Sequence, residues 1–181
     1  MLRRFTDTFV LGALLGALAG CSDPVPAAVG VAIELNVPES GGCALQGPTP
    51  QLGDLKANRR AYDGDKGLSA SCRVSNNGGG FTFQANVRAS MPALTFNLTN
   101  GTLDANGKGT ALLSLFATAI GSPVVSPASQ PCTITVVNRD NKLAVQETAI
   151  WARYDCPTLN GNPTPICPDV SGQFYLENCG K

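Results

Sequence analysis

The chain carries its clearest structural pattern in Phe81-Thr82-Phe83-Gln84-Ala85-Asn86-Val87-Arg88. Apolar and polar side chains alternate there with a period of two, which predicts a strand that buries one face. Residues 94–99 repeat the alternation, and residues 29–37 show it near the start of the chain. No long stretch has the period of an amphipathic helix. Closely spaced strands joined by Gly- and Pro-rich turns predict an all-β fold, and specifically a β-sandwich.

Further strands are expected at residues 69–75, 109–119, 132–138, 143–155 and 173–179, the last three as a meander. Residues 122–131 contain three prolines and should cross between strands in an extended conformation, because proline does not continue a helix. Asn100-Gly101 and Asn106-Gly107 predict turns. The stretch from Gly101 to Gly107 also resembles a turn of bacterial immunoglobulin-like modules. That resemblance implies an immunoglobulin-like sandwich.

The composition excludes several classes of function. The chain has 181 residues, and its 13 basic side chains balance 13 acidic ones. This length predicts one domain, and neutrality argues against nucleic acid as a partner. The chain has no histidine, which excludes a Ser-His-Asp triad, a Cys-His pair and His-ligated metal sites. No phosphate-loop or nucleophile-elbow spacing occurs either. We therefore expect no catalytic residues, no cofactor and no metal ion.

The first residues predict export. Arg3 and Arg4 precede an uncharged apolar run, residues 9–19, which is shorter than the ~20 residues needed to span a bilayer. A positive start, a short apolar run and small residues before a cleavage site define a secretory signal.

The junction Leu18-Ala19-Gly20-Cys21 resembles the lipobox of bacterial lipoprotein precursors. The resemblance implies removal of residues 1–20 as a signal peptide and attachment of lipid, with fatty acids such as palmitate, to Cys21. Several acyl chains would anchor the protein stably, and Ser22 after the cysteine implies sorting to the outer membrane. Residues 21–28 then form a short tether, and residues 29–181 form a single β-sandwich domain. Whether it faces the periplasm or the cell surface stays open.

Six cysteines remain besides Cys21: Cys43, Cys72, Cys132, Cys156, Cys167 and Cys179. An even number in an exported chain predicts disulfide bonds. Six cysteines allow fifteen connectivities. Cys156 and Cys167 bracket a turn-rich loop that a bond could close, and Cys43 and Cys72 bracket an irregular segment. Elimination leaves Cys132 with Cys179. The expected meander, however, places these two on either side of one strand, about 9–10 Å apart. A disulfide needs Cα atoms within about 7 Å, so either the last strand joins the opposite sheet or both cysteines pair elsewhere.

Residues 38–67 are rich in Gly and Pro and predict a long irregular N-terminal loop segment, with a short helix at residues 54–61. This segment holds a basic and aromatic cluster, which we interpret as a contact surface for a partner. Trp151, the only tryptophan, is expected on the outer face of its strand next to Arg153, as a second candidate surface. The contact-surface candidates are Lys56, Arg59, Arg60, Tyr62, Trp151 and Arg153.

The acidic residues do not form a complete site. Asp63 with Asp65, and Asp104 with Asn106, have too few oxygen ligands for calcium and are expected to be solvated turns. The sequence thus favours an outer-membrane lipoprotein with a non-catalytic binding, adhesion or envelope-assembly role, contacting the membrane through its lipid and an envelope or surface protein. One alternative is a histidine-independent glycan hydrolase that uses carboxylates such as those of Asp54, Asp63 or Asp65. Another is a structural envelope protein without a specific ligand.

Overall fold

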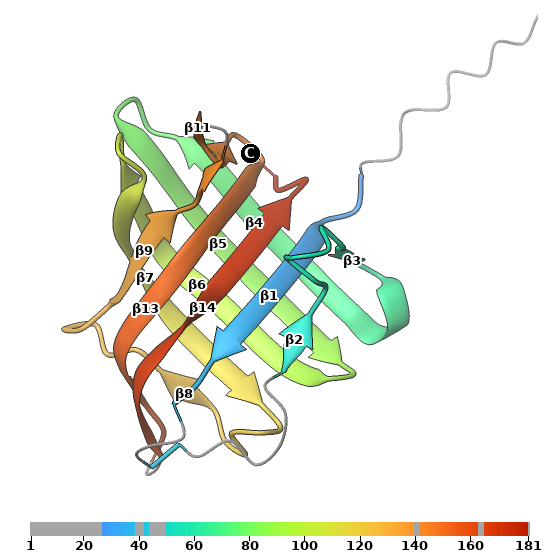
Figure 1. Cartoon of the computed structure of the whole chain (residues 1–181), viewed down its shortest axis with the longest axis vertical. Coiled ribbons are helices and arrows are strands. Elements are labelled where there is room, and N and C mark those ends of the chain that lie inside the picture. Colours follow the sequence, from blue (N-terminus) through green and yellow to red (C-terminus); the bar gives the residue numbers. More distant parts are fainter. Residues whose placement is uncertain (1–26, 39–41, 44–49, 140–141, 163–164, 181) are drawn as a thin grey trace, which may run out of the picture.

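The structure is a computed structural model that describes residues 27–38, 42–43, 50–139, 142–162 and 165–180. Within these ranges a 12-stranded sheet folds into two facing layers (Figure 1). The only helical element there is a short 3-10 turn, Asp65–Gly67, and no helix is long and apolar enough to cross a bilayer. The prediction of an all-β, disulfide-bonded sandwich is confirmed. Cys21 and its lipobox lie outside the described residues.

One layer consists, in spatial order, of β1 (Gly30–Asn36), β14 (Ile166–Glu177), β13 (Ala149–Asn160) and β9 (Cys132–Val136). The other consists of β7 (Lys108–Ala117), β6 (Ala93–Asp104), β5 (Gly80–Ser90) and β4 (Leu68–Asn76). The sheet passes from the first layer to the second at β9, which pairs with both β13 and β7. We call the first layer the front layer, because Figure 1 shows it nearest the viewer.

Short strands complete the sheet. Two of them, β2 (Gln51–Leu52) and β3 (Ala61–Tyr62), pair with β1, and β8 (Val124–Val125) pairs with β7 and β13. A further strand, β12 (Val145–Gln146), pairs with β13, while β10 (Asn138–Arg139) and β11 (Lys142–Leu143) form a separate hairpin.

The core lies between the two layers and is organised around aromatic rings. Phe96 of β6 packs between Tyr154 of β13 and Phe174 of β14, at centroid distances of 5.6 and 6.0 Å. Phe83 lies 6.1 Å from Phe174. All four side chains are buried, and each occupies an apolar position of an alternating strand. Alternation in the sequence therefore translates directly into the inward faces of the two layers.

A strand forms in each predicted stretch, with three corrections. The strand expected at residues 143–155 is broken into β11, β12 and the start of β13, and the strand expected at residues 132–138 into β9 and β10. Asn100-Gly101 is not a turn: both residues lie inside β6, where a shift in register, with Asn100 at φ 54°, marks a bulge. The turn-rich loop after residue 155 is shorter than expected, because β13 and β14 continue pairing as far as Asn160 and Ile166. Asn106-Gly107 does form a turn.

The helix predicted at residues 54–61 is wrong. Asp54 and Arg59 exchange backbone hydrogen bonds of 2.9 Å in both directions, so the chain folds back on itself as a tight loop. The Asp54 carboxylate also accepts a 2.8 Å hydrogen bond from the Ala57 amide. Local side chain–backbone bonds of this kind favour turns over helix. The segment is otherwise irregular, as expected.

All six cysteines are bonded, but the expected partners are wrong. The bonds are Cys43–Cys167, Cys72–Cys179 and Cys132–Cys156. Although β13 and β14 are neighbours, Cys156 lies opposite Val170 and Cys167 opposite Leu159, so these two cysteines are out of register. The alternative that Cys132 and Cys179 pair elsewhere is confirmed.

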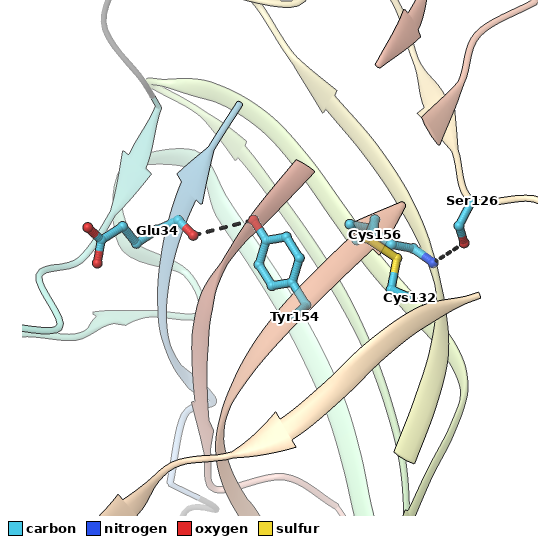
Figure 2. Close-up of a disulfide and its surroundings, with 6 residues drawn as sticks. Glu34, Ser126, Cys132, Tyr154 and Cys156 are labelled. Carbon is cyan, nitrogen blue, oxygen red and sulfur yellow. Dashed lines mark hydrogen bonds between the residues drawn. A yellow bond between two sulfur atoms is a disulfide. The ribbon is translucent and has the colours of Figure 1, made fainter. Parts of the chain in front are cut away.

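Beneath the front layer, one tyrosine crosses a neighbouring strand. The Tyr154 hydroxyl donates to the backbone oxygen of Glu34, 3.3 Å away on β1, with β14 between the two strands (Figure 2). The ring passes over Gly172, where an added Cβ would lie 2.7 Å from Tyr154 Cζ. Burial raises the pKa of Tyr154 well above its ordinary value, and the charges of Glu34 and Asp155 add to this effect. Glycine is required at position 172 because only its bare backbone leaves room for the ring.

Figure 2 also shows how the edge of the core near Cys132–Cys156 is closed. The buried Ser126 Oγ accepts a 2.9 Å hydrogen bond from the Leu113 amide, and the Ser126 amide donates to the Leu113 carbonyl at 2.8 Å. The Ser126 side chain thus satisfies a buried backbone amide of β7.

Candidate binding groove

The outer face of the front layer presents alternate residues of β13 and β14. The strand register sets Trp151 opposite Tyr175, and Arg153 opposite Gln173, which in turn lies opposite Glu34 of β1. Ile150, Ala152 and Tyr154 are fully buried on the other face. The expectation that Trp151 and Arg153 point away from the core is therefore correct.

A hollow of about 540 Å³ opens on this face across β1, β14, β13 and the nearby β2. Its side-chain lining is mostly polar and includes Glu34, Asn36, Gln51, Arg153, Asp155 and Gln173. A second hollow of about 400 Å³ shares Asp155 and Ser171 with the first and reaches Asp169 and Thr133. We call the two together the front groove. Their sizes fall in the ordinary range for small-ligand sites.

The charged side chains of the larger hollow do not neutralise one another through contacts. In the part of the chain that the structure describes, Glu34, Arg153 and Asp155 make no side-chain hydrogen bond or salt bridge. Two neighbouring amides are partly used: Asn36 Nδ2 donates to Ser171 Oγ at 3.3 Å, and Gln173 Oε1 accepts from Trp151 Nε1 at 3.3 Å. The Gln173 amide nitrogen stays available. The groove thus offers both donors and acceptors to a ligand.

A cluster of aromatic and charged groups borders the groove. Trp151 and Tyr175 meet edge to face with centroids 6.1 Å apart, and the Arg60 guanidinium carbon lies 3.9 Å from the centre of the Tyr175 ring. Glu177 accepts hydrogen bonds from the hydroxyls of Tyr175, at 2.9 Å, and Tyr62, at 3.3 Å. Burial, and secondarily the Glu177 carboxylate, raises the pKa of Tyr175.

The two contact surfaces expected from the sequence meet at this cluster. The Arg60 guanidinium lies over the Tyr175 ring, and Trp151 meets the same ring edge to face. The Arg60 side chain is only 10% exposed and lies 4.0 Å from a Glu177 oxygen, so it holds the irregular segment against β14 and offers little surface to a partner. Tyr62 is 40% exposed.

Lys56 and Arg59 lie apart from the groove, on the exposed loop after β2. Arg59 is paired with Asp54 at 3.0 Å. The sequence interpretation missed Glu34, Gln51, Asp155 and Gln173. The parity of Trp151 would have found Asp155, and the single acidic residue within the apolar β1 stretch would have pointed to Glu34. Nothing in the sequence places Gln51 beside them.

The carboxylates considered as catalytic or calcium-binding groups are used by the backbone. Asp63 accepts from the Ala70 amide at 2.7 Å and Asp65 from the Tyr62 amide at 3.0 Å. Asp54 is held by Ala57 and Arg59, and these hydrogen bonds lower its pKa. Among the described residues, no group of three potential metal ligands is present.

Comparison of the chain with protein families, with curated proteins and with solved structures finds no match. The immunoglobulin-like arrangement therefore stays a prediction.

Proposed function

We propose that this protein is a lipid-anchored, non-catalytic binding component of a bacterial outer membrane, and that the front groove is its binding site. The observation that carries the proposal is the set of three charged side chains, Glu34, Arg153 and Asp155, that line one hollow without protein partners. Ligand sites are concave and carry a few placed polar or charged groups, so charged side chains that stay open around a hollow suit a ligand. The polar side chains that line the hollow suit hydrogen bonding to a ligand better than packing against an apolar surface.

The anchor rests on the sequence. The junction from Leu18 to Cys21 is the specific motif, and the tether of residues 21–28 is short enough to hold the domain near its membrane. Three disulfides support an oxidising location outside the cytoplasm.

The hydrolase alternative is less well supported at the residues named for it. Asp54, Asp63 and Asp65 spend oxygens on backbone amides that hold the irregular segment in shape. Freeing one of them for acid–base chemistry would leave that amide without its partner. We therefore propose binding without turnover, and the carboxylates of the front groove are assigned to hydrogen bonding with the ligand.

Two experiments test the proposal. Cys21→Ala should abolish acyl labelling and move the protein out of the membrane fraction; unchanged membrane association would refute the anchor. A photo-crosslinking residue at Gln51, inside the groove, should form adducts in intact cells. The matched control is Gln84, an exposed glutamine on β5 of the other layer. Equal adduct formation at both positions, or none at either, would refute the groove as the binding site.

A further inference from the structure

We infer that the front groove takes a neutral oligosaccharide. This inference rests on the proposed function, since it names the ligand class of the same groove. It is carried by the mixture of hydrogen-bonding groups, the bordering aromatic pair and the shape of the two joined hollows.

The hydrogen-bonding groups match sugar hydroxyls. A hydroxyl both donates and accepts, and a sugar ring presents several in a row. The groove supplies acceptors in Glu34 and Asp155 and donors in Arg153, with amides of both kinds in Gln51 and Gln173. A ligand with only acceptors would leave the two carboxylates desolvated and unpaired, which is costly.

The aromatic border supplies the second element of sugar recognition. One face of a pyranose ring is lined by C–H groups and is apolar, so it packs well on an aromatic side chain. Trp151 is half-buried, and its ring is held by the hydrogen bond to Gln173 and the contact with Tyr175. Trp151 lies two residues from Arg153 on the same face of β13, about 7 Å along the strand. An aromatic ring held in place costs little entropy when a ligand binds.

The shape favours a chain of several sugars. The hollows share Asp155 and Ser171, so the groove continues from Gln51 to Asp169 across the strands. The groove is also open to solvent along the face, as expected for a ligand that enters from the side and extends beyond the site.

Other ligand classes fit less well. Anions meet two carboxylates and a single guanidinium in the larger hollow, and a third carboxylate, Asp169, in the smaller one. An extended peptide would bind most readily by adding a strand to an open edge. The groove lies over β14, however, which is paired on both sides by β1 and β13.

The chain contains its own reporter for the test, because Trp151 is its only tryptophan. We would titrate the purified mature protein with chitotetraose, cellotetraose, maltotetraose and mannotetraose and follow tryptophan fluorescence. At least one should change the emission saturably, and the panel distinguishes acetylated amino sugars from plain hexoses as the source. No response from any of the four, checked by calorimetry, would overturn the carbohydrate assignment.

Matched variants locate the site. Arg153→Ala and Gln51→Ala should each weaken binding about tenfold or more, the loss expected of a hydrogen bond to a charged or well-placed group. Arg88→Ala and Gln84→Ala are the controls, since both side chains are exposed on β5 of the opposite layer. Equal loss in test and control variants would overturn the assignment to this groove. All four should melt like the wild type, because exposed substitutions shift stability by less than about 0.5 kcal/mol.

Two further readouts separate this inference from the proposed function. Binding of a neutral sugar should change little between about 50 mM and about 500 mM NaCl, whereas a basic peptide would bind more weakly at high salt. A silent sugar panel, with salt-sensitive protein adducts at Gln51, would overturn the carbohydrate inference and keep the binding function. Cleavage of a bound tetrasaccharide, detected by mass spectrometry, would refute the non-catalytic function and keep the ligand class.

Discussion

Gly172→Ala tests the packing that supports the groove from below. The new Cβ would lie 2.7 Å from Tyr154 Cζ and in closer contact with the Tyr154 hydroxyl and the Glu34 carbonyl oxygen. Since Tyr154 is fully buried, its ring cannot swing into solvent. Overpacking of this kind costs about 1–3 kcal/mol, and loss of the hydrogen bond from Tyr154 to Glu34 adds about 1 kcal/mol.

The expected destabilisation is therefore about 2–4 kcal/mol, which for a chain of this size lowers the melting temperature by about 4–16 °C. Thermal unfolding followed by circular dichroism, with the disulfides intact, measures it. Gly79→Ala is the matched control, since nothing lies within 4 Å of a Cβ at that position. Combining Gly172→Ala with Tyr154→Phe should recover part of the loss, because the hydroxyl contact disappears.

A Gly172→Ala protein that melts within about 2 °C of the wild type would refute the placement of Tyr154 across β14. A similar drop in Gly79→Ala, where the new Cβ meets no atom within 4 Å, would show that the loss at position 172 does not come from the clash with Tyr154. Failure of the double variant to recover any stability would show that the clash with the β1 carbonyl dominates.

Three further outcomes follow from the structure. Ser126→Ala should cost about 1–3 kcal/mol in urea unfolding, because it leaves the buried Leu113 amide without an acceptor; a near-neutral effect would contradict that hydrogen bond. Joint replacement of Cys132 and Cys156 by serine should cost about 3 kcal/mol by loop-closure entropy, given the sequence separation of 24, and peptide mapping of the wild type should recover this pair and not a pair between Cys156 and Cys167. Hydrogen bonds from the Lys108 and Asn106 amides lower the pKa of Asp104 below 3.8, so its stabilisation is complete above that value and is lost as pH falls through the lowered folded pKa; Asp104→Ala should therefore unfold more easily than the wild type at about pH 6, and the gap should close in strong acid.

The part of the fold that follows from the sequence is the inward and outward direction of side chains. Phe83, Val87 and Phe96 occupy apolar positions of alternating stretches, and all three are buried between the layers. The same parity correctly places Trp151 and Arg153 on the outer face, opposite the buried Ile150. This works because successive side chains of a strand point to opposite faces, whichever strand lies next to it.

Two local predictions, the turn at Asn100-Gly101 and the helix at residues 54–61, were wrong because other interactions outweighed the local preference of these residues. Asn100-Gly101 is a common turn pair, yet β6 continues through it by forming a bulge. Pairing with β5 on one side and β7 on the other stabilises the strand beyond what the dipeptide prefers. In residues 54–61, capping of the loop by the Asp54 carboxylate prevailed over helix.

The groove could be assembled only in three dimensions. Glu34 and Gln51 come from the start of the domain and Arg153 and Asp155 from its last third, and they line one hollow because β14 pairs between β1 and β13. The sequence predicts Arg60 as an exposed contact residue. Its side chain is only 10% exposed in the structure, because it packs over Tyr175 of β14, a residue far away in the sequence.

The sequence alone determined where apolar and polar residues alternate and so where strands form. It also showed an even number of cysteines besides Cys21, and first residues that predict export and a lipid anchor. These are local properties, readable from neighbouring residues. The tertiary structure decided which cysteine faces which, as the bond from Cys72 to Cys179 across 107 residues shows. Strand order and register are set by packing between distant segments, and the energy of that packing leaves no mark on either segment by itself.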